Sequence, residues 1–442
     1  MTNTNLPVYP AQACDGLQHF FKEEKINDHI LHFMASFAGR LDFINMKDAI
    51  SAAMTAFPLL RCGYFQDKRH PYWREQNFLA GDLVQLVETD HPDSQVNQFL
   101  YQELSETDGP QLRAAIIRSA EHDILCIIVN HMLCDAAGFK ELLYLMCSAY
   151  SYEGSKENMP GIRPMAAMRN RSIHQVLTSF TGKERLKLRF SKYKIPAQND
   201  SFAFEGDLKH PFIEKRVLNK EFFRALKTYA KAHGATVNDV MLAALHRTVF
   251  QTIGKAVPIP CANDLRKYMN SPTNGICNIV TNLCCCIDME SGDSFEDTLM
   301  KVNSVMKSEK ANIGCAKSLL LLENVFHILP YKAVKPILQK NFSNPFIAFT
   351  NIGVLDADRL KFGTSVITEA FMTGSIKYAP YFQLAVCTFH DEATLSINLY
   401  GSQSDEKQIS DFLDRLILEL QNGLNAESTS HPAGTHTVKA PF

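Results

Sequence analysis

Apolar stretches of two kinds alternate along the first half of the chain. Residues 28–40 mix apolar and small side chains as a strand does, whereas apolar side chains recur at helical spacing through residues 42–57. Two apolar runs follow at residues 111–118 and 123–130, separated by the polar turn SAEHD, and residues 138–150 again have a helical pattern. This order of elements predicts an α/β unit in the first half.

The second half repeats the alternation. Residues 210–218 predict a strand, and the helix that follows should end at Gly234, because glycine readily adopts the conformation that closes a helix. Thr236 and Asp239 have the spacing of a capping box and predict the start of the next helix. Several strand-like apolar runs come later, and residues 405–420 predict a final amphipathic helix. The two halves therefore have similar α/β content, without a strict sequence repeat.

The composition changes between the halves. Pro, Gly, Ser and Asn become frequent there, and the stretch from Arg169 to Lys194 carries eight basic side chains against one acid, Glu184. This basic stretch suits either a solvated connector or a docking surface for a phosphate-bearing substrate or an acidic protein partner. The expected segments are an N-terminal subdomain at 1–165, a linker at 166–207, a C-terminal subdomain at 208–424 and a disordered tail at 425–442.

The overall composition is that of a globular protein. Hydrophobic residues make up 46% of the 442 positions, which is enough for a sizeable buried core. The formal net charge of −2 gives no overall attraction to nucleic acid or to anionic lipid. The chain opens without the basic and apolar regions of a signal peptide, and no apolar run approaches the ~20 residues that cross a bilayer. We therefore expect a cytoplasmic protein without a transmembrane segment.

The 12 cysteines and the absence of several short motifs exclude several kinds of site. No two cysteines have C-x-x-C spacing, and most lie inside apolar stretches, so we expect buried, reduced side chains and no metal site. The sequence also lacks G-x-x-x-x-G-K-[ST], H-E-x-x-H and G-x-S-x-G. A phosphate-binding loop, a zincin-type metal site and a hydrolase nucleophile elbow are therefore not expected.

One stretch, from Asn130 to Gly138, places chemistry-bearing side chains at the end of a buried strand. His131 follows the apolar run directly, and Asp135 comes four residues later, just before the expected helix. Loops that leave a buried strand often carry catalytic groups, and histidine is the side chain most easily poised as a base near neutral pH. The spacing H-x-x-x-D alone is weak evidence, because a structural core histidine would give the same pattern.

The surroundings of this stretch extend the pattern. The blocks PLLRCGYF, QLRAAIIRSAEHDILCIIVNHMLCDAAGF, CANDLRKY and FTNIGVLD occur in this order. Together they resemble the condensation-domain and chloramphenicol-acetyltransferase-like acyltransferase superfamily, whose signature is H-H-x-x-x-D-G after a core strand. The resemblance runs from about residue 28 to residue 420. Two positions depart from the signature, because Asn130 stands in place of the first histidine and Ala136 in place of the glycine.

The resemblance implies a fold and a reaction. The fold class is α/β, with two chloramphenicol-acetyltransferase-like subdomains that form a V-shaped pseudo-dimer and an active-site tunnel at their interface. The reaction is acyl transfer from a thioester to an amine or alcohol acceptor, with His131 as general base. The donor would be acyl-coenzyme A or an acyl group on the phosphopantetheine of a carrier protein, and no cofactor or metal would be bound permanently. A stand-alone, monomeric transferase of nonribosomal peptide or lipid biosynthesis fits these implications.

The resemblance also assigns roles to other side chains. Asp135 would point away from the substrate and pair with Arg266 of the D-L-R strand, which would fix the loop that carries His131. The alternative is that Arg266 lies on the surface at a strand end. The candidates for lining the tunnel or stabilising an oxyanion are Asn351, Thr350, Asn130 and Gly138.

A second class of function remains open. Members with degenerate motifs exist, so the chain could instead be a non-catalytic condensation-like module that binds a carrier protein or a lipid. The presence of both His131 and Asp135 favours the enzyme.

Overall fold

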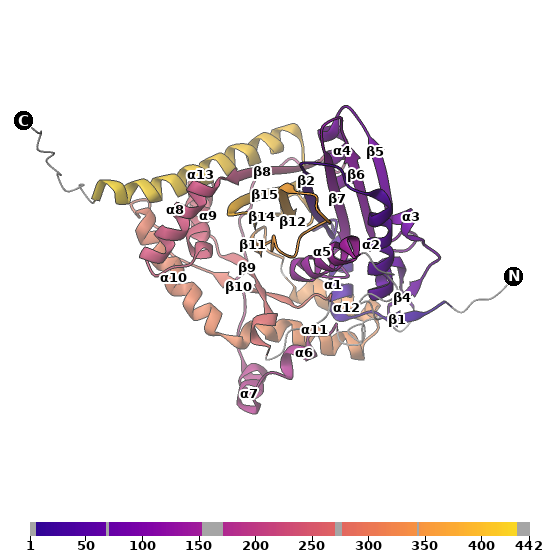
Figure 1. Ribbon diagram of the computed structural model, residues 1–442. Helices are drawn as coiled ribbons and strands as arrows, with labels where there is room; N and C mark the ends of the chain where they lie inside the picture. The colour runs from indigo at the N-terminus through magenta and orange to yellow at the C-terminus, as the bar shows by residue number, and fades with distance from the viewer. Residues whose placement is uncertain (1–5, 68–69, 153–170, 270–275, 343, 431–442) are drawn as a thin grey trace, which may run out of the picture.

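Two α/β halves lie side by side in the computed structural model (Figure 1). The structure describes residues 6–67, 70–152, 171–269, 276–342 and 344–430. The first half is built around a five-stranded sheet and the second around a seven-stranded sheet, with a small three-stranded sheet near the N-terminus. The α/β class with two sheet-based subdomains, expected from the sequence, is confirmed.

The five-stranded sheet has the order β12-β2-β7-β6-β5. Its strands are β2 (Ile30–Phe37), β5 (Val84–Glu88), β6 (Leu112–Arg118), β7 (Asp123–Asn130) and β12 (Ile367–Thr373). Strand β12 belongs to the second half of the sequence, yet it pairs antiparallel with β2. The sheet of the first half is therefore completed by a strand from the second half.

Helices cover both faces of this sheet. The helices around it are α2 (Phe43–Ala56), α4 (Pro92–Leu100) and α5 (Ala136–Ser151). Helices α2 and α5 pack together against one face, and α4 packs against the other. All eight residues of β7 are consequently buried, because neither face meets water. This explains why β7 is a continuous apolar run rather than an alternating one.

The N-terminal region forms a small sheet against the first half. The strands and helices here are β1 (Val8–Pro10), α1 (Ala13–Glu23), η1 (Pro58–Arg61), β3 (Cys62–Phe65), β4 (Tyr72–Glu75) and α3 (Ala80–Leu83). The sheet order is β1-β4-β3, and β3 and β4 pair antiparallel. Strands β3 and β4 are consecutive in the chain and lie side by side in this sheet.

The larger sheet has the order β10-β9-β11-β14-β15-β13, and β8 also pairs with β15. Its strands are β8 (Pro211–Leu218), β9 (Ile259–Asp264), β10 (Val280–Cys285), β11 (Ile347–Val354), β13 (Lys377–Tyr378), β14 (Phe382–Phe389) and β15 (Glu392–Tyr400). The helices packed beside it are α8 (Lys220–Ala232), α9 (Val237–Ile253), α10 (Phe295–Ala311) and α13 (Gln403–Ser430). The capping box of Thr236 and Asp239 opens α9 as the sequence predicted.

Short helices connect the two halves along one side of the molecule. They are α6 (His174–Leu177), α7 (Gly182–Phe190), η4 (Leu265–Tyr268), η5 (Ile313–Ala316), α11 (Lys317–Ile328) and α12 (Tyr331–Asn341). Helices α6 and α7 fall in the segment expected as a linker, whose residues 166–170 lie outside the described ranges. Helix α13 continues to Ser430, so residues 425–430 are helical and the expectation of disorder there was wrong. Residues 431–442 lie outside the described ranges.

Two kinds of feature are absent from the described ranges. No helix in them is both long and apolar enough to cross a membrane. No group of three or more His, Cys, Asp or Glu side chains in them is arranged to hold a metal ion.

Candidate active site

His131 lies where strand β7 ends, and its backbone is held from two sides. Its N–H donates to the carbonyl of His29 at 2.7 Å, next to the start of β2. Its carbonyl accepts from Nδ2 of Asn278 at 2.7 Å, and the same amide donates to the carbonyl of Met132 at 3.1 Å. Asn278 belongs to the second half, just before β10. The backbone of His131 therefore sits at the contact between the two halves.

The imidazole of His131 is partly exposed, but its two nitrogens differ in environment. Nδ1 is buried and has no hydrogen-bond partner among the described residues. The accessible edge of the ring is therefore the Nε2 side. Burial lowers the pKa of His131 below its ordinary value, and the nearby Lys377 acts in the same direction. Backbone carbonyls and Asp135 oppose this shift without cancelling it, so the ring is held in its neutral form at pH 7.

Asp135 connects the motif to the second half. It is the N-cap of α5, where Oδ1 accepts from the N–H of Gly138 at 2.9 Å. Oδ2 accepts from Nη1 of Arg266 and from the N–H of Ile279, each at 2.9 Å. The contact between Asp135 and Arg266 that the sequence predicted is thus present. Both carboxylate oxygens are engaged in these bonds, and the side chain is only 3% exposed.

Arg266 reaches Asp135 from the residues that follow β9. Its Nη2 donates to the carbonyl of Cys277 at 2.9 Å, and its Nη1 also meets Oδ1 of Asp264 at 3.1 Å. Burial lowers the pKa of Arg266, but Asp135, Cys277 and Asp264 together outweigh burial, so the pKa is raised. Arg266 is therefore not a surface residue at a strand end, and it ties Asp135 to the segment before β10.

A second arginine holds the same loop, and sequence analysis missed it. Arg171 forms a bidentate ion pair with Asp15, at 2.7 and 3.0 Å, and also donates to the carbonyls of Met132 and Leu133 at 3.1 and 3.2 Å. Its side chain is 3% exposed. The sequence placed Arg171 in a basic stretch read as a connector or docking surface, which was wrong for this residue. Its neighbours in sequence are also basic and polar, so no local pattern separates it from exposed arginines.

Two of the tunnel candidates have structural contacts instead. Asn130 is fully buried, with Nδ2 donating to Gln111 at 2.6 Å and Oδ1 accepting from the N–H of Met132 at 2.8 Å. A Cβ at Gly138 would come within 2.8 Å of the Cβ of Cys134, so glycine there permits close packing. Both residues are buried within the fold, so the expectation that they line a tunnel is corrected. Ala136 is the first residue of α5, so it needs no positive φ.

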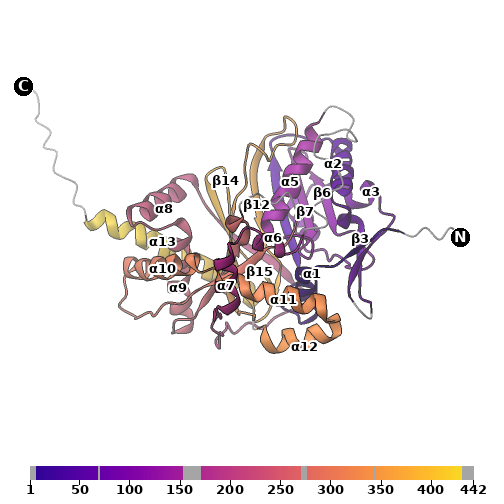
Figure 2. The ribbon, with the colours of Figure 1, turned by 90° about the horizontal axis from the view of Figure 1, so that it is seen from below.

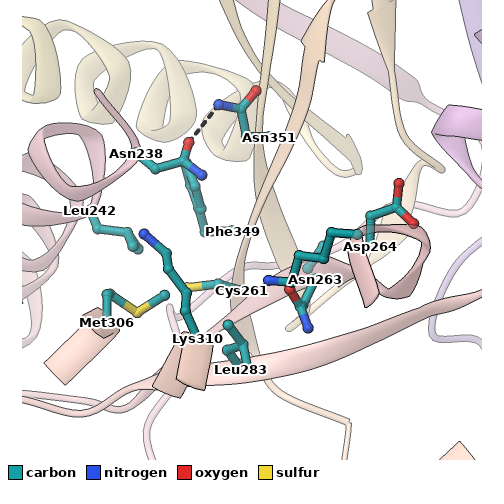
Figure 3. A pocket seen from close by; sticks show the side chains of 12 residues that line it. Asn238, Leu242, Cys261, Asn263, Asp264, Leu283, Met306, Lys310, Phe349 and Asn351 are labelled. Atoms are coloured by element: carbon teal, nitrogen blue, oxygen red, sulfur yellow. Dashed lines mark hydrogen bonds between the residues drawn. The ribbon is translucent and has the colours of Figure 1, made fainter. Parts of the chain in front are cut away.

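The other two candidates lie on β11, beside a cavity of about 240 Å³ (Figure 3). Asn351 lines this cavity, and its Nδ2 donates to Oδ1 of Asn238. Thr350 is half-buried on the same strand. The lining also includes Asp264, which contacts Arg266, and the two cations Lys267 and Lys310. No hydrogen bond among the described residues joins Asn351 or Thr350 to His131, so the cavity and the imidazole are two separate features of the site.

Comparison with known proteins adds an independent line of evidence. No protein-family model matches the chain. The uncharacterized protein Rv2305 of Mycobacterium tuberculosis is 23% identical over 288 residues, which span 63% of this chain and 63% of that protein. An identical match is found to the uncharacterized protein MT2362 from another strain of the same organism.

Solved structures match over nearly the whole chain. The trichothecene 15-O-acetyltransferase TRI3 of Fusarium sporotrichioides superposes with a TM-score of 0.69, at 12% identity and 96% coverage of both chains. Polyketide synthase associated protein 5 of Mycobacterium tuberculosis gives a TM-score of 0.67, at 15% identity, covering 95% of this chain and 100% of that one. The condensation domain of the Monacolin K polyketide synthase MokA gives 0.66, at 12% identity, covering 97% and 98%. The fold of this chain is therefore shared with these acetyltransferase and condensation-domain structures.

Proposed function

We propose that this protein is an acyltransferase that moves an acyl group from a thioester to an amine or hydroxyl acceptor. The observation that carries the proposal is the state of His131. Its ring is neutral at pH 7, is accessible along its Nε2 edge, and stands on a loop fixed from both halves of the fold. A neutral, positioned imidazole is what a general base requires.

The chemistry needs one base and no covalent bond between the enzyme and the acyl group. Nε2 of His131 takes the proton of the acceptor as its nitrogen or oxygen attacks the thioester carbonyl. The tetrahedral intermediate then expels the thiolate, which recovers the proton from the imidazolium and leaves as the thiol. A base positioned in this way contributes roughly 10²–10⁴-fold to the rate. Cys134 offers no alternative nucleophile, because the side chain is completely buried and burial raises its pKa well above the ordinary value.

The cavity beside β11 fits the donor rather than the acceptor. Lys267 and Lys310 supply positive charge at its lining, which also carries the carboxylate of Asp264, while Asn238 and Asn351 supply amide groups. A pantetheine arm carries amides, and the phosphate groups of coenzyme A or of a carrier protein's phosphopantetheine carry negative charge. These groups are complementary to the lining. This complementarity supports acyl-coenzyme A or an acyl-carrier protein as the proposed donor, bound as a substrate.

Mass spectrometry of acyl transfer, paired with release of free thiol, tests the proposal. Acyl-coenzyme A and acyl-carrier donors are screened against amine and alcohol acceptors with the wild type, His131→Ala and His91→Ala. His91 is the control because its side chain is exposed and makes no capping bond on α4. We expect His131→Ala to lose roughly 10²–10⁴-fold in kcat/KM with an unchanged melting temperature, and His91→Ala to keep its activity.

The pH profile gives a second readout. Because the pKa of His131 is lowered by burial, the acidic limb of kcat/KM should fall below pH 6.5, the ordinary midpoint of histidine. An acidic limb at or above pH 6.5, or full turnover by His131→Ala, would overturn the assignment of the base. A wild type that binds thioester donors without ever releasing thiol would instead support a non-catalytic condensation-like module.

A further inference from the structure

Three helices line one side of the molecule at the edge between its two halves. Helices α7, α11 and α12 run along the lower side in Figure 1 and face the viewer in Figure 2. Both α7 and α11 contact η5, which joins them in space although they are far apart in sequence. Together with residues 191–194, which follow α7, these helices form what we call the α7–α12 face.

The α7–α12 face is strongly basic. Its acidic residues are Glu184, whose carboxylate is bonded to Thr181 at the start of α7, and Glu323, which is 1% exposed. None of its exposed cations forms an ion pair with an acid in the part of the chain that the structure describes. These exposed cations are Lys183, Arg185, Lys187, Arg189, Lys192, Lys194, Lys332 and Lys340. The net charge of −2 for the whole chain therefore conceals a predominantly basic face, which is bordered at α12 by Glu23 and Glu24, the partners of Lys335.

Large apolar side chains project from the same helices. Leu186 and Phe190 lie one turn apart on α7 and are 58% and 71% exposed. On α11, Leu321 and Ile328 lie two turns apart and are 52% and 76% exposed, and Ile337 on α12 is 37% exposed. Leaving such side chains in water is unfavourable, so their concentration on one basic face indicates a surface that is covered when the protein works.

We propose that the α7–α12 face binds the surface of an anionic lipid bilayer. Cationic side chains would lie at the level of the headgroups, and the leucine, isoleucine and phenylalanine side chains would enter the boundary between headgroups and acyl chains. This combination of basic and apolar side chains is typical of helices that lie on a membrane without crossing it.

The arrangement favours a bilayer over an acidic protein. A protein interface usually has an apolar centre depleted of charge and a polar rim around it. On α7 the cations and the apolar residues instead alternate along one helix, in the order Lys183, Leu186, Lys187 and Phe190. A lipid surface can bind such a helix, because the headgroups pair with the cations while the apolar side chains insert between neighbouring headgroups. The inference is independent of the proposed reaction, because it concerns where the protein binds.

Vesicle flotation with the full-length chain tests the proposal. The vesicles contain either phosphatidylcholine alone or phosphatidylcholine mixed with phosphatidylglycerol. The test variant reverses three exposed cations of α7, as Lys183→Glu, Lys187→Glu and Arg189→Glu. The matched control reverses three exposed cations of α8, at the far end of the molecule, as Lys220→Glu, Arg224→Glu and Lys231→Glu. Both variants change the net charge equally, so any difference in their binding to vesicles depends on where the reversed charges lie.

We expect the wild type to float with the anionic vesicles only, and less so at high salt. The α7 variant should bind at least about 100-fold more weakly, since each cation near an anionic surface contributes about a fivefold factor, while the α8 control should bind like the wild type. A second variant, Leu186→Ser with Phe190→Ser, should weaken binding without changing its salt dependence.

Three outcomes would overturn the proposal. The wild type could fail to float with anionic vesicles, or the α8 control could lose as much binding as the α7 variant. A wild type that is retained on immobilised polyglutamate, but does not float, would replace the bilayer by an acidic protein partner. None of these outcomes bears on the assignment of His131, because flotation does not measure turnover.

Discussion

Neutralising Asp135 without changing its shape should uncouple the motif from the second half of the fold. In Asp135→Asn the amide oxygen can keep the capping bond from the N–H of Gly138. The amide NH₂ then faces two groups that are themselves donors, the N–H of Ile279 and Nη1 of Arg266. Two donor–acceptor contacts thereby become donor–donor contacts, and the guanidinium of Arg266 loses its buried counter-charge.

The expected cost is large because the pair is shielded from water. The side chains of Asp135 and Arg266 are 3% and 17% exposed. Removing one partner of such a pair costs about 3–5 kcal/mol, most of it from the uncompensated charge that remains. The double variant Asp135→Asn with Arg266→Met should cost less than the sum of its parts, because the second change removes the stranded charge.

The same helix supplies a matched control. Glu141 on α5 pairs with Arg359 through two hydrogen bonds, but the two side chains are 51% and 48% exposed. An exposed pair of this kind contributes only about 0–1 kcal/mol, so Glu141→Gln should barely change stability. The two variants make the same chemical change on one helix and differ only in burial.

Chemical denaturation measures the free energy of unfolding of each variant. Trp73 is the one tryptophan in the chain and is fully buried in the first half, so its fluorescence follows that half directly. Far-ultraviolet circular dichroism follows both halves. If Asp135→Asn costs no more than Glu141→Gln, the buried pair does not hold the motif, and the account of the loop is wrong.

Two further changes test other buried groups. Arg171→Met leaves the carboxylate of Asp15 without its counter-charge at 1% exposure and should cost about 3–5 kcal/mol in the same denaturation experiment. Arg189→Met on the exposed side of α7 should stay within about 0.5 kcal/mol, and equal costs would contradict the buried role of Arg171. His246 has no hydrogen-bond partner at either ring nitrogen among the described residues, and burial lowers its pKa to about 3. The unfolded chain therefore takes up a proton near pH 6.5 that the folded chain refuses, so stability falls as the pH falls below 6.5. His246→Leu should remove about 2 kcal/mol of the loss between pH 7.5 and pH 5; an unchanged pH slope would show that His246 titrates normally.

Elements whose signal is local were predictable from the sequence. Strands β6 and β7 and helices α2 and α5 fall within a few residues of their expected bounds, because apolar periodicity and turn residues act over one element. Helices α11 and α12 had no prediction, although both are ordinary amphipathic helices. Strand β12 could not be placed in the sheet of the first half, since no local pattern records which of two sheets a strand joins.

Some residues of the candidate site likewise have a local sequence signal, and others have none. His131 and Asp135 could be identified because they are four residues apart in one recognisable stretch, and Arg266 could be identified because the D-L-R block marks it. Asn278 lies in none of the blocks that carry the resemblance, and Arg171 could be recognised only as part of a charged stretch. Both act through backbone carbonyls of the loop, and a carbonyl has no sequence signature. The partners of a backbone group can be read only after the chain has folded.

The bonds around the loop of residues 131–135 have a consequence for catalysis. The loop starts on β7 of the first half, but its carbonyls and its aspartate are bonded by Asn278, Ile279 and Arg266 of the second half. The first half alone therefore lacks the groups that set the position of the imidazole. Any change that loosens the contact between the halves should displace the imidazole of His131 before it unfolds either sheet, because these few bonds are weaker than the two covered sheets. The proposed activity is thereby coupled to the docking of the two halves, although the histidine itself belongs to only one of them.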